Sequence, residues 1–161
     1  MQTNTPNITP SLVFDHQAEE AATFYTSVFK NSKIHNVIRY GEGQPGPAGS
    51  VCCVAFQLDG QEFQAANGGP YFKFSEGVSL YKSCDTQEEL DDVWNKLLEG
   101  GEAQQCGWLR DKFGVFWQIA PTALWEIMKD PDPRKTERVL NAVFGMVKLD
   151  IAAIEQAYAG A

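Results

Sequence analysis

Apolar and polar residues alternate at the start of the chain and then change to a helical spacing. Residues 8–14 form a short run in which polar residues alternate with Leu12 and Phe14, a pattern typical of a strand. Residues 18–30 follow, with apolar side chains at i, i+3, i+4 and i+7, namely Ala21, Phe24, Tyr25 and Val28. This spacing predicts an amphipathic helix, and either Asp15 or His16 is expected to cap its first turn.

The next segments predict strands around a tight hairpin. Residues 34–40 read as a strand, and residues 41–49 form a loop rich in Gly and Pro. Residues 51–58 and 61–66 are two further strands joined by Asp59-Gly60. Such a pair favours a two-residue turn because both of its central positions require positive φ.

This turn fixes which side chains share a face of the hairpin. It sets Ala55 opposite Gln64 and Gln57 opposite Glu62, so that one face is largely polar. The opposite face is apolar and carries Phe56, Leu58, Phe63 and Ala65. We therefore expect the apolar face to pack on the helix and the polar face to line a cleft, which Ser11 would join from the first strand.

The same order of patterns returns later in the chain. The predicted helix at residues 85–99 carries apolar residues at the spacing of the first helix, each displaced by a constant 69 positions: Leu90, Val93, Trp94 and Leu97. A strand pattern at residues 78–84 precedes it, and a hairpin pattern at 106–110 and 115–120 follows. We interpret the repetition as two βαβββ modules.

The fold prediction is therefore an α+β chain with a helical extension. We expect a single domain over residues 1–161, with module one at about 7–67, module two at about 77–121 and a helical tail at about 122–161. The tail reads as two or three short helices. Its apolar residues exceed what a monomer of this size would comfortably expose, which predicts a homodimer: Leu140, Val143, Phe144, Val147 and Leu149.

Composition and charge narrow the possible partners. Thirteen Lys and Arg against 21 Asp and Glu give a formal charge of -8, which disfavours binding to nucleic acid or to an anionic membrane surface. No run approaches the roughly 20 apolar residues of a membrane helix, and the first ten residues lack the features of a secretory signal. We expect a cytoplasmic protein whose four cysteines are reduced.

Four segments carry a specific resemblance. They are I-x-P-S-L-V-F from Ile8, A-E-E-A-A-x-F-Y from Ala18, W-L-x-D-K-F-G-V-x-W-Q-I-x-P from Trp108, and M-x-K-L-D-I-A-A-I-E-Q-A from Met146. The chain resembles, over nearly its whole length, the PhnB-like branch of the glyoxalase, bleomycin-resistance and extradiol-dioxygenase group, the vicinal oxygen chelate superfamily. Its proteins are often named 3-demethylubiquinone-9 3-methyltransferase domains.

The resemblance implies paired modules whose mixed sheets curl into a U-shaped cleft, commonly completed by a second subunit. In metal-using members a divalent ion sits there, held by the first and last strands of each module. The matching positions here hold Thr9, Val78, Gln64 and Gln118. Because none of these is a carboxylate or an imidazole, we predict no bound catalytic metal. A shift in this placement would bring in Glu62, His16 or Asp85, and His35 has no acidic partner visible in the sequence.

Two functions remain open. The first is a metal-free protein that binds a small molecule, like the bleomycin-resistance members; the second is a metal-dependent lyase, isomerase or dioxygenase. The sequence assigns no catalytic residue, and the methyltransferase label is unsupported because no G-x-G-x-x-G motif follows a strand. The residues expected to line the cleft are Ser11, Gln57, Gln64, Trp108, Phe116 and Gln118.

Overall fold

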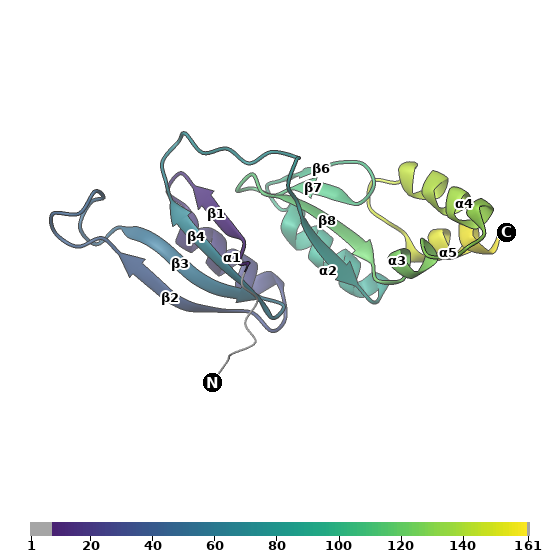
Figure 1. The fold of residues 1–161 in the computed structure, drawn as a ribbon, viewed down its shortest axis with the longest axis horizontal. Coiled ribbons are helices and arrows are strands. Elements are labelled where there is room, and N and C mark those ends of the chain that lie inside the picture. The colour runs from purple at the N-terminus through teal and green to yellow at the C-terminus, as the bar shows by residue number, and fades with distance from the viewer. Residues whose placement is uncertain (1–7, 161) are drawn as a thin grey trace. The chain divides into compact units, whose positions relative to one another are not determined.

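The computed structural model describes residues 8–160 (Figure 1). The chain divides between Lys73 and Phe74 into two compact units. Each unit contains one of the predicted modules, and the helical tail belongs to the second unit.

The first unit is a four-stranded mixed sheet with one helix. Its elements are β1 (Ser11–Phe14), α1 (Ala18–Val28), β2 (Lys33–Arg39), β3 (Val51–Leu58) and β4 (Gln61–Asn67). The strand order is β1-β4-β3-β2. The first strand is parallel to β4, and the remaining pairs are antiparallel.

The second unit repeats this arrangement. Its elements are β5 (Leu80–Cys84), α2 (Gln87–Leu98), β6 (Glu102–Ala103), β7 (Trp108–Arg110) and β8 (Phe116–Pro121). The order β5-β8-β7-β6 matches that of the first sheet. Because the first strand and the helix of each unit both begin 69 residues apart, the internal repeat is confirmed, and with it the α+β fold.

The tail forms three helices, as its pattern predicted. They are α3 (Ala123–Ile127), α4 (Pro133–Phe144) and α5 (Ile151–Ala159). Side chains of Asp132 and Asp150 cap α4 and α5 by accepting hydrogen bonds from backbone N–H groups of the first turns. Among residues 8–160, no helix is long and apolar enough to span a membrane.

The hairpin through Asp59-Gly60 has the predicted geometry. Both residues have positive φ, 48° and 84° respectively, and Ala55 pairs with Gln64 while Gln57 pairs with Glu62. The apolar face packs on α1, with Phe56 stacked on Phe63 at 5.5 Å between ring centroids. The polar face of this sheet carries the exposed Gln64.

The first-turn capping prediction is wrong. Neither Asp15 nor His16 caps α1; instead the side-chain Oδ1 of Asn67 accepts a 2.8 Å hydrogen bond from the backbone N–H of Ala18. Asn67 can do this because it ends β4 directly beside Phe14, the last residue of β1. The cap therefore depends on the parallel strand pairing and could not be located from local sequence.

Strand ends also differ from the predicted bounds. The first strand of each sheet begins later than its apolar run, at Ser11 and Leu80, and both Ile8 and Val78 are exposed. The two-residue strand β6 was not predicted, because so short a segment carries no periodic pattern.

A buried carboxylate organises the second hairpin. Asp111 is 3% exposed, and its Oδ1 accepts hydrogen bonds from the backbone N–H groups of Phe113 and Val115 at 2.8 and 3.0 Å. Its Oδ2 accepts a 2.8 Å hydrogen bond from Nε1 of Trp117. These contacts tie the turn to β8, and Leu109, Trp117 and Ile119 complete the core beneath α2.

Candidate ligand pocket

A row of three side chains crosses the second sheet on the face opposite α2. Tyr81 of β5 pairs with Gln118 of β8, which pairs in turn with Trp108 of β7. Residues that are directly opposite on neighbouring strands point to the same face of a sheet. The phenol, the amide and the indole therefore form one continuous strip.

The helical tail covers this strip and leaves a pocket of about 300 Å³ beneath it. This volume is at the lower end of the roughly 300–1,000 Å³ typical of small-molecule sites. The sheet and the loop before β7 contribute Tyr81, Cys106, Trp108, Gln118 and Ala120. The tail contributes Leu124, Trp125, Met128, Leu140, Val143, Phe144 and Leu149.

The pocket lining is largely apolar and contains no charged side chain. Nε2 of Gln118 donates a 2.8 Å hydrogen bond to Oγ of Ser79, which orients the amide. Burial raises the pKa of Tyr81 above its ordinary value of 10.0, against the opposing effect of a hydrogen bond with Trp125. The phenol is therefore neutral at physiological pH and offers one donor and one acceptor.

A glycine brings the tail against the sheet beside the pocket. Gly107 has φ of 79°, and a Cβ atom at this position would lie 2.7 Å from the carbonyl oxygen of Ile119 and 3.0 Å from a side-chain carbon of Leu149. Its backbone N–H donates to the carbonyl oxygen of Val147 at 2.7 Å. Only glycine permits this close approach without displacement of its neighbours.

The equivalent row of the first unit is open. Ser11 pairs with Gln64, which pairs with Ala55, and all three are exposed. Gln57 lies on the same face, but its Nε2 donates to the backbone and side-chain oxygens of Asn31, at 2.9 and 3.2 Å.

The structure brings together two of the six predicted cleft residues in this pocket. Trp108 and Gln118 both line it, whereas Phe116, two residues before Gln118 on β8, is buried and does not line the pocket. The other three, Ser11, Gln57 and Gln64, belong to the open face of the first unit.

The sequence patterns did not place the tail residues or Tyr81 in this pocket. Leu140, Val143 and Phe144 were interpreted as apolar surface for a second subunit, whereas in the structure they also line this pocket. Tyr81 was missed because the 69-residue offset matches it to the buried Leu12. The two first strands begin 69 residues apart, but their pairing differs by one residue: Tyr81 pairs with Gln118, whereas Ser11, 70 residues earlier, pairs with Gln64.

That shift also changes the placement of the superfamily's metal positions. Ser79, rather than the exposed Val78, lies beside Gln118. The corresponding donors are therefore the hydroxyls of Thr9 and Ser79 and the amides of Gln64 and Gln118. Hydroxyl and amide oxygens are weak ligands for Zn, Ni or Fe, which prefer imidazole, thiolate or carboxylate groups. Within residues 8–160, no three His, Cys, Asp or Glu side chains are grouped for metal binding.

His35 has an acidic partner that its sequence context did not reveal. Its Nε2 lies 3.1 and 3.2 Å from the two carboxylate oxygens of Glu62. The register of β2 against β3 is interrupted between Ile34 and Asn36, and this irregularity at His35 accompanies its approach to Glu62. The expectation that His35 lacks an acidic partner is therefore wrong.

A larger hollow of about 1130 Å³ lies in the first unit between α1 and the loop at residues 41–50. Its lining includes Asp15, Glu19 and Glu20, and Nη2 of Arg39 donates to both carboxylate oxygens of Glu19 at 2.9 Å. Because this lining carries three carboxylates, the smaller apolar pocket is the better candidate for a specific ligand site.

Comparison with solved structures identifies the fold. A 3-demethylubiquinone-9 3-methyltransferase-like PhnB protein of Bacillus cereus is 40% identical, with a TM-score of 0.66, and the match covers 71% of this chain and 98% of that one. A protein of Pseudomonas aeruginosa is 23% identical, with a TM-score of 0.61, over 71% and 96% of the two chains.

A more distant structure shares the fold alone. It is a mutant of the fosfomycin resistance protein FosX of Listeria monocytogenes, complexed with Mn(II) and 1S,2S-dihydroxypropylphosphonic acid. It is 11% identical, with a TM-score of 0.56, over 77% of this chain and 98% of that one. The molecule thus has the glyoxalase and bleomycin-resistance fold, with additional C-terminal helices.

The family assignment is more specific than the fold. The family model described as 3-demethylubiquinone-9 3-methyltransferase matches residues 6–120. The chain belongs to this PhnB-like family of the vicinal oxygen chelate superfamily. Comparison with curated proteins gave no match.

Proposed function

We propose that this protein binds a small, neutral, largely apolar molecule in the pocket between the second sheet and the helical tail. The observation that carries this proposal is the Tyr81–Gln118–Trp108 row, which lines a pocket of about 300 Å³ without any charged side chain. A charged ligand would lose its hydration there without gaining an ionic partner, which disfavours it.

The polar groups of the pocket suit a ligand with a single hydrogen-bonding group. With Nε2 of Gln118 directed to Ser79, its Oε1 is available as an acceptor. Aromatic side chains of Tyr81, Trp108 and Trp125 offer faces and edges for a planar molecule. We therefore propose a neutral aromatic or heteroaromatic ligand that carries one O–H or N–H donor.

We also propose that ligand binding needs no transition metal, since the corresponding positions offer only hydroxyl and amide oxygens. A metal-dependent lyase, isomerase or dioxygenase is the second candidate, and the observation that favours it is the His35–Glu62 pair on the polar face of the first sheet. Two such ligands would need a third from elsewhere to hold a catalytic ion.

We further propose that the protein forms a homodimer and resides in a reducing compartment. After folding, Val143 and Leu149 are buried, but Leu140, Phe144 and Val147 remain exposed. This apolar surface supports a homodimer. The four cysteines form no disulfide, which supports a reducing compartment such as the cytoplasm.

The test is a titration with the neutral fluorescent probe N-phenyl-1-naphthylamine. We expect saturable binding with enhanced probe fluorescence, and a loss of affinity on Trp108→Phe or Gln118→Leu. Gln57→Leu is the matched control, because Gln57 lies in the first unit and its side-chain amide donates to oxygens of Asn31, away from this pocket. Absence of saturable binding, or equal affinity in all variants, would contradict the proposed site.

A further inference from the structure

The outer wall of the pocket lies beyond the residues that the family model matches. Seven of the twelve lining residues come from the tail, whereas the match to the family model ends at residue 120. The match to the Bacillus cereus protein covers 98% of that chain but only 71% of this one. The geometry of the wall is therefore decided by contacts within the tail and between the tail and the rest of the second unit.

Among the helices of the tail, α3 is the one without a buried residue. It contributes Leu124 and Trp125 to the pocket, yet none of its five residues is buried. At its N-terminal end, the Thr122 hydroxyl donates to Oδ1 of Asp85 at 2.7 Å, and its backbone N–H donates to the carbonyl oxygen of Cys84. Because no residue of α3 is buried, packing alone does not fix the C-terminal end of this helix.

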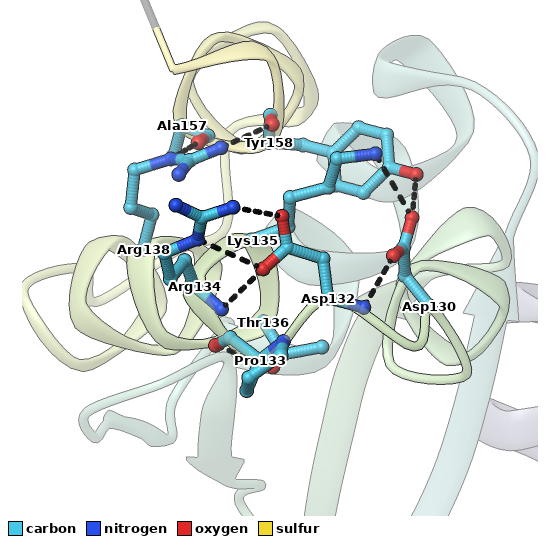
Figure 2. Close-up of polar contacts among 9 residues, drawn as sticks. All are labelled: Asp130, Asp132, Pro133, Arg134, Lys135, Thr136, Arg138, Ala157 and Tyr158. Atoms are coloured by element: carbon cyan, nitrogen blue, oxygen red, sulfur yellow. Dashed lines mark hydrogen bonds and ion pairs between the residues drawn. The ribbon is translucent and has the colours of Figure 1, made fainter.

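That other end is held by Asp130. Its Oδ2 accepts hydrogen bonds from the Tyr158 hydroxyl and from Nζ of Lys135, and its Oδ1 accepts from the backbone N–H of Asp132 (Figure 2). Nζ of Lys135 also lies 4.8 Å from the centre of the Tyr158 ring, which adds a cation–π contact. One carboxylate thus joins the segment after α3 to both α4 and α5.

The partners of Asp130 are themselves anchored. Arg138 of α4 donates to the carbonyl oxygens of Ala157 and Tyr158, at 2.8 and 2.9 Å, at the end of α5 (Figure 2). At the start of α5, Gln87 of α2 exchanges hydrogen bonds with the backbone of Leu149 and Ile151. The contacts of Asp130 therefore connect α3 to a support that is fixed to the body of the unit.

We propose that Asp130 is a positioning residue for the ligand pocket: with Tyr158 and Lys135 it fixes the C-terminal end of α3, so that Leu124, Trp125 and Met128 close over the Gln118 side of the sheet. This inference rests on the proposed function of the pocket. Asp130 acts through these neighbours and does not touch the ligand, since it is not among the lining residues.

The test compares Tyr158→Phe and Asp130→Asn with the wild type. Tyr158→Phe removes only the hydroxyl that binds Asp130, and it preserves the ring beneath Lys135. The matched control is Lys129→Ala, whose side chain lies beside Asp130 in sequence but makes only an exposed ion pair with Glu126. We expect both variants to bind N-phenyl-1-naphthylamine about fivefold or more weakly, as for loss of one hydrogen bond, and the control to bind like the wild type.

Two further measurements separate positioning from general stabilisation. A purely structural role would lower the stability to urea but leave the affinity of the folded protein for the probe unchanged. The backbone N–H groups of Met128 and Lys129 donate to the carbonyl oxygens of Leu124 and Glu126. Their hydrogen-exchange rates, measured without the probe, therefore report how stably the C-terminal end of α3 is formed. We expect faster exchange there in both variants.

The outcomes distinguish this inference from the function on which it rests. If the wild type fails to bind the probe, the proposed function and the role of Asp130 in ligand binding are both overturned. If the wild type binds and both variants bind equally well, with unchanged exchange around α3, the role of Asp130 is overturned while the proposed function stands. Weaker binding with faster exchange, absent in Lys129→Ala, supports it.

Discussion

Replacement of Asp111 by Asn tests how one buried carboxylate sets the hairpin that carries Trp108 and Gln118. The carboxylate accepts from at least three donors, two of them backbone N–H groups and one the indole of Trp117. The Asn amide retains one oxygen for the backbone donors but turns its own N–H₂ group toward the indole N–H. Two donors then face each other in a buried site.

The expected cost follows from these contacts. One charge-assisted hydrogen bond is lost, at about 1.5–3 kcal/mol, and a buried donor left without an acceptor costs about 1–3 kcal/mol more. We therefore expect Asp111→Asn to lower the free energy of unfolding by about 3–5 kcal/mol. Asp92→Asn, at an exposed i,i+4 pair with Lys96 on α2, is the matched control and should change it by less than about 0.5 kcal/mol.

The assay is urea denaturation followed by circular dichroism, with the slope of the transition unchanged between variants. A double-mutant cycle with Trp117→Phe isolates the contact with the indole, because that change removes the opposing donor. The combined variant should be more stable than the sum of the single losses predicts, by at least about 1 kcal/mol. Additive losses, or an Asp111→Asn effect below about 1 kcal/mol, would refute this account.

Four further outcomes are expected. Gln118→Leu should weaken binding of N-phenyl-1-naphthylamine by roughly 1–3 kcal/mol with a smaller loss of stability. Gln64→Leu should leave the affinity unchanged, because Gln64 is exposed in the first unit and does not line the pocket. Protein purified without chelator should contain well under one equivalent of transition metal, and EDTA should not shift its Tm; stoichiometric Zn, Ni, Mn or Fe, lost on Glu62→Gln, would instead favour the enzyme. Sedimentation equilibrium at micromolar concentration should give a dimer mass, which Phe144→Glu should reduce to that of a monomer. Hydrogen bonds from Tyr158, from the backbone of Asp132 and from Lys135 lower the pKa of Asp130 from 3.8 to about 2. The ionised carboxylate should therefore stabilise the fold fully above about pH 4, and this stabilisation should be lost as the pH falls toward 2. The difference in urea midpoint between wild type and Asp130→Asn should shrink over that interval.

The two sheets share a strand order but differ in what covers them. In each unit one helix packs on one face of the sheet. The opposite face carries a row of three paired residues with a Gln at its centre. The row containing Gln64 is open, whereas the row containing Gln118 lies under the tail. An internal repeat has therefore produced two similar faces, of which only the second is enclosed within its own unit.

The repeat, the helices and the first hairpin could be predicted from the sequence because their signals are local. Apolar residues at i, i+3, i+4 and i+7 identify a buried helix face wherever that face packs. Asp59-Gly60 likewise fixes its turn and its register without outside help, because both residues must adopt positive φ. The turn was enough to place Gln64 and Ala55 opposite each other.

The pocket itself was decided by contacts between segments far apart in the chain. The apolar spacing of Leu140 and Phe144 indicated a face but not its partner, which is the strip crossing Gln118. The pairing of β5 with β8 is offset by one residue from the 69-residue repeat of the helices. This offset places Tyr81 on that strip, although the repeat matches Tyr81 to the buried Leu12. The Asn67 cap and the His35–Glu62 pair likewise arise from strand pairing. Sequence periodicity determines which side of an element is apolar, but only tertiary packing determines what that side meets.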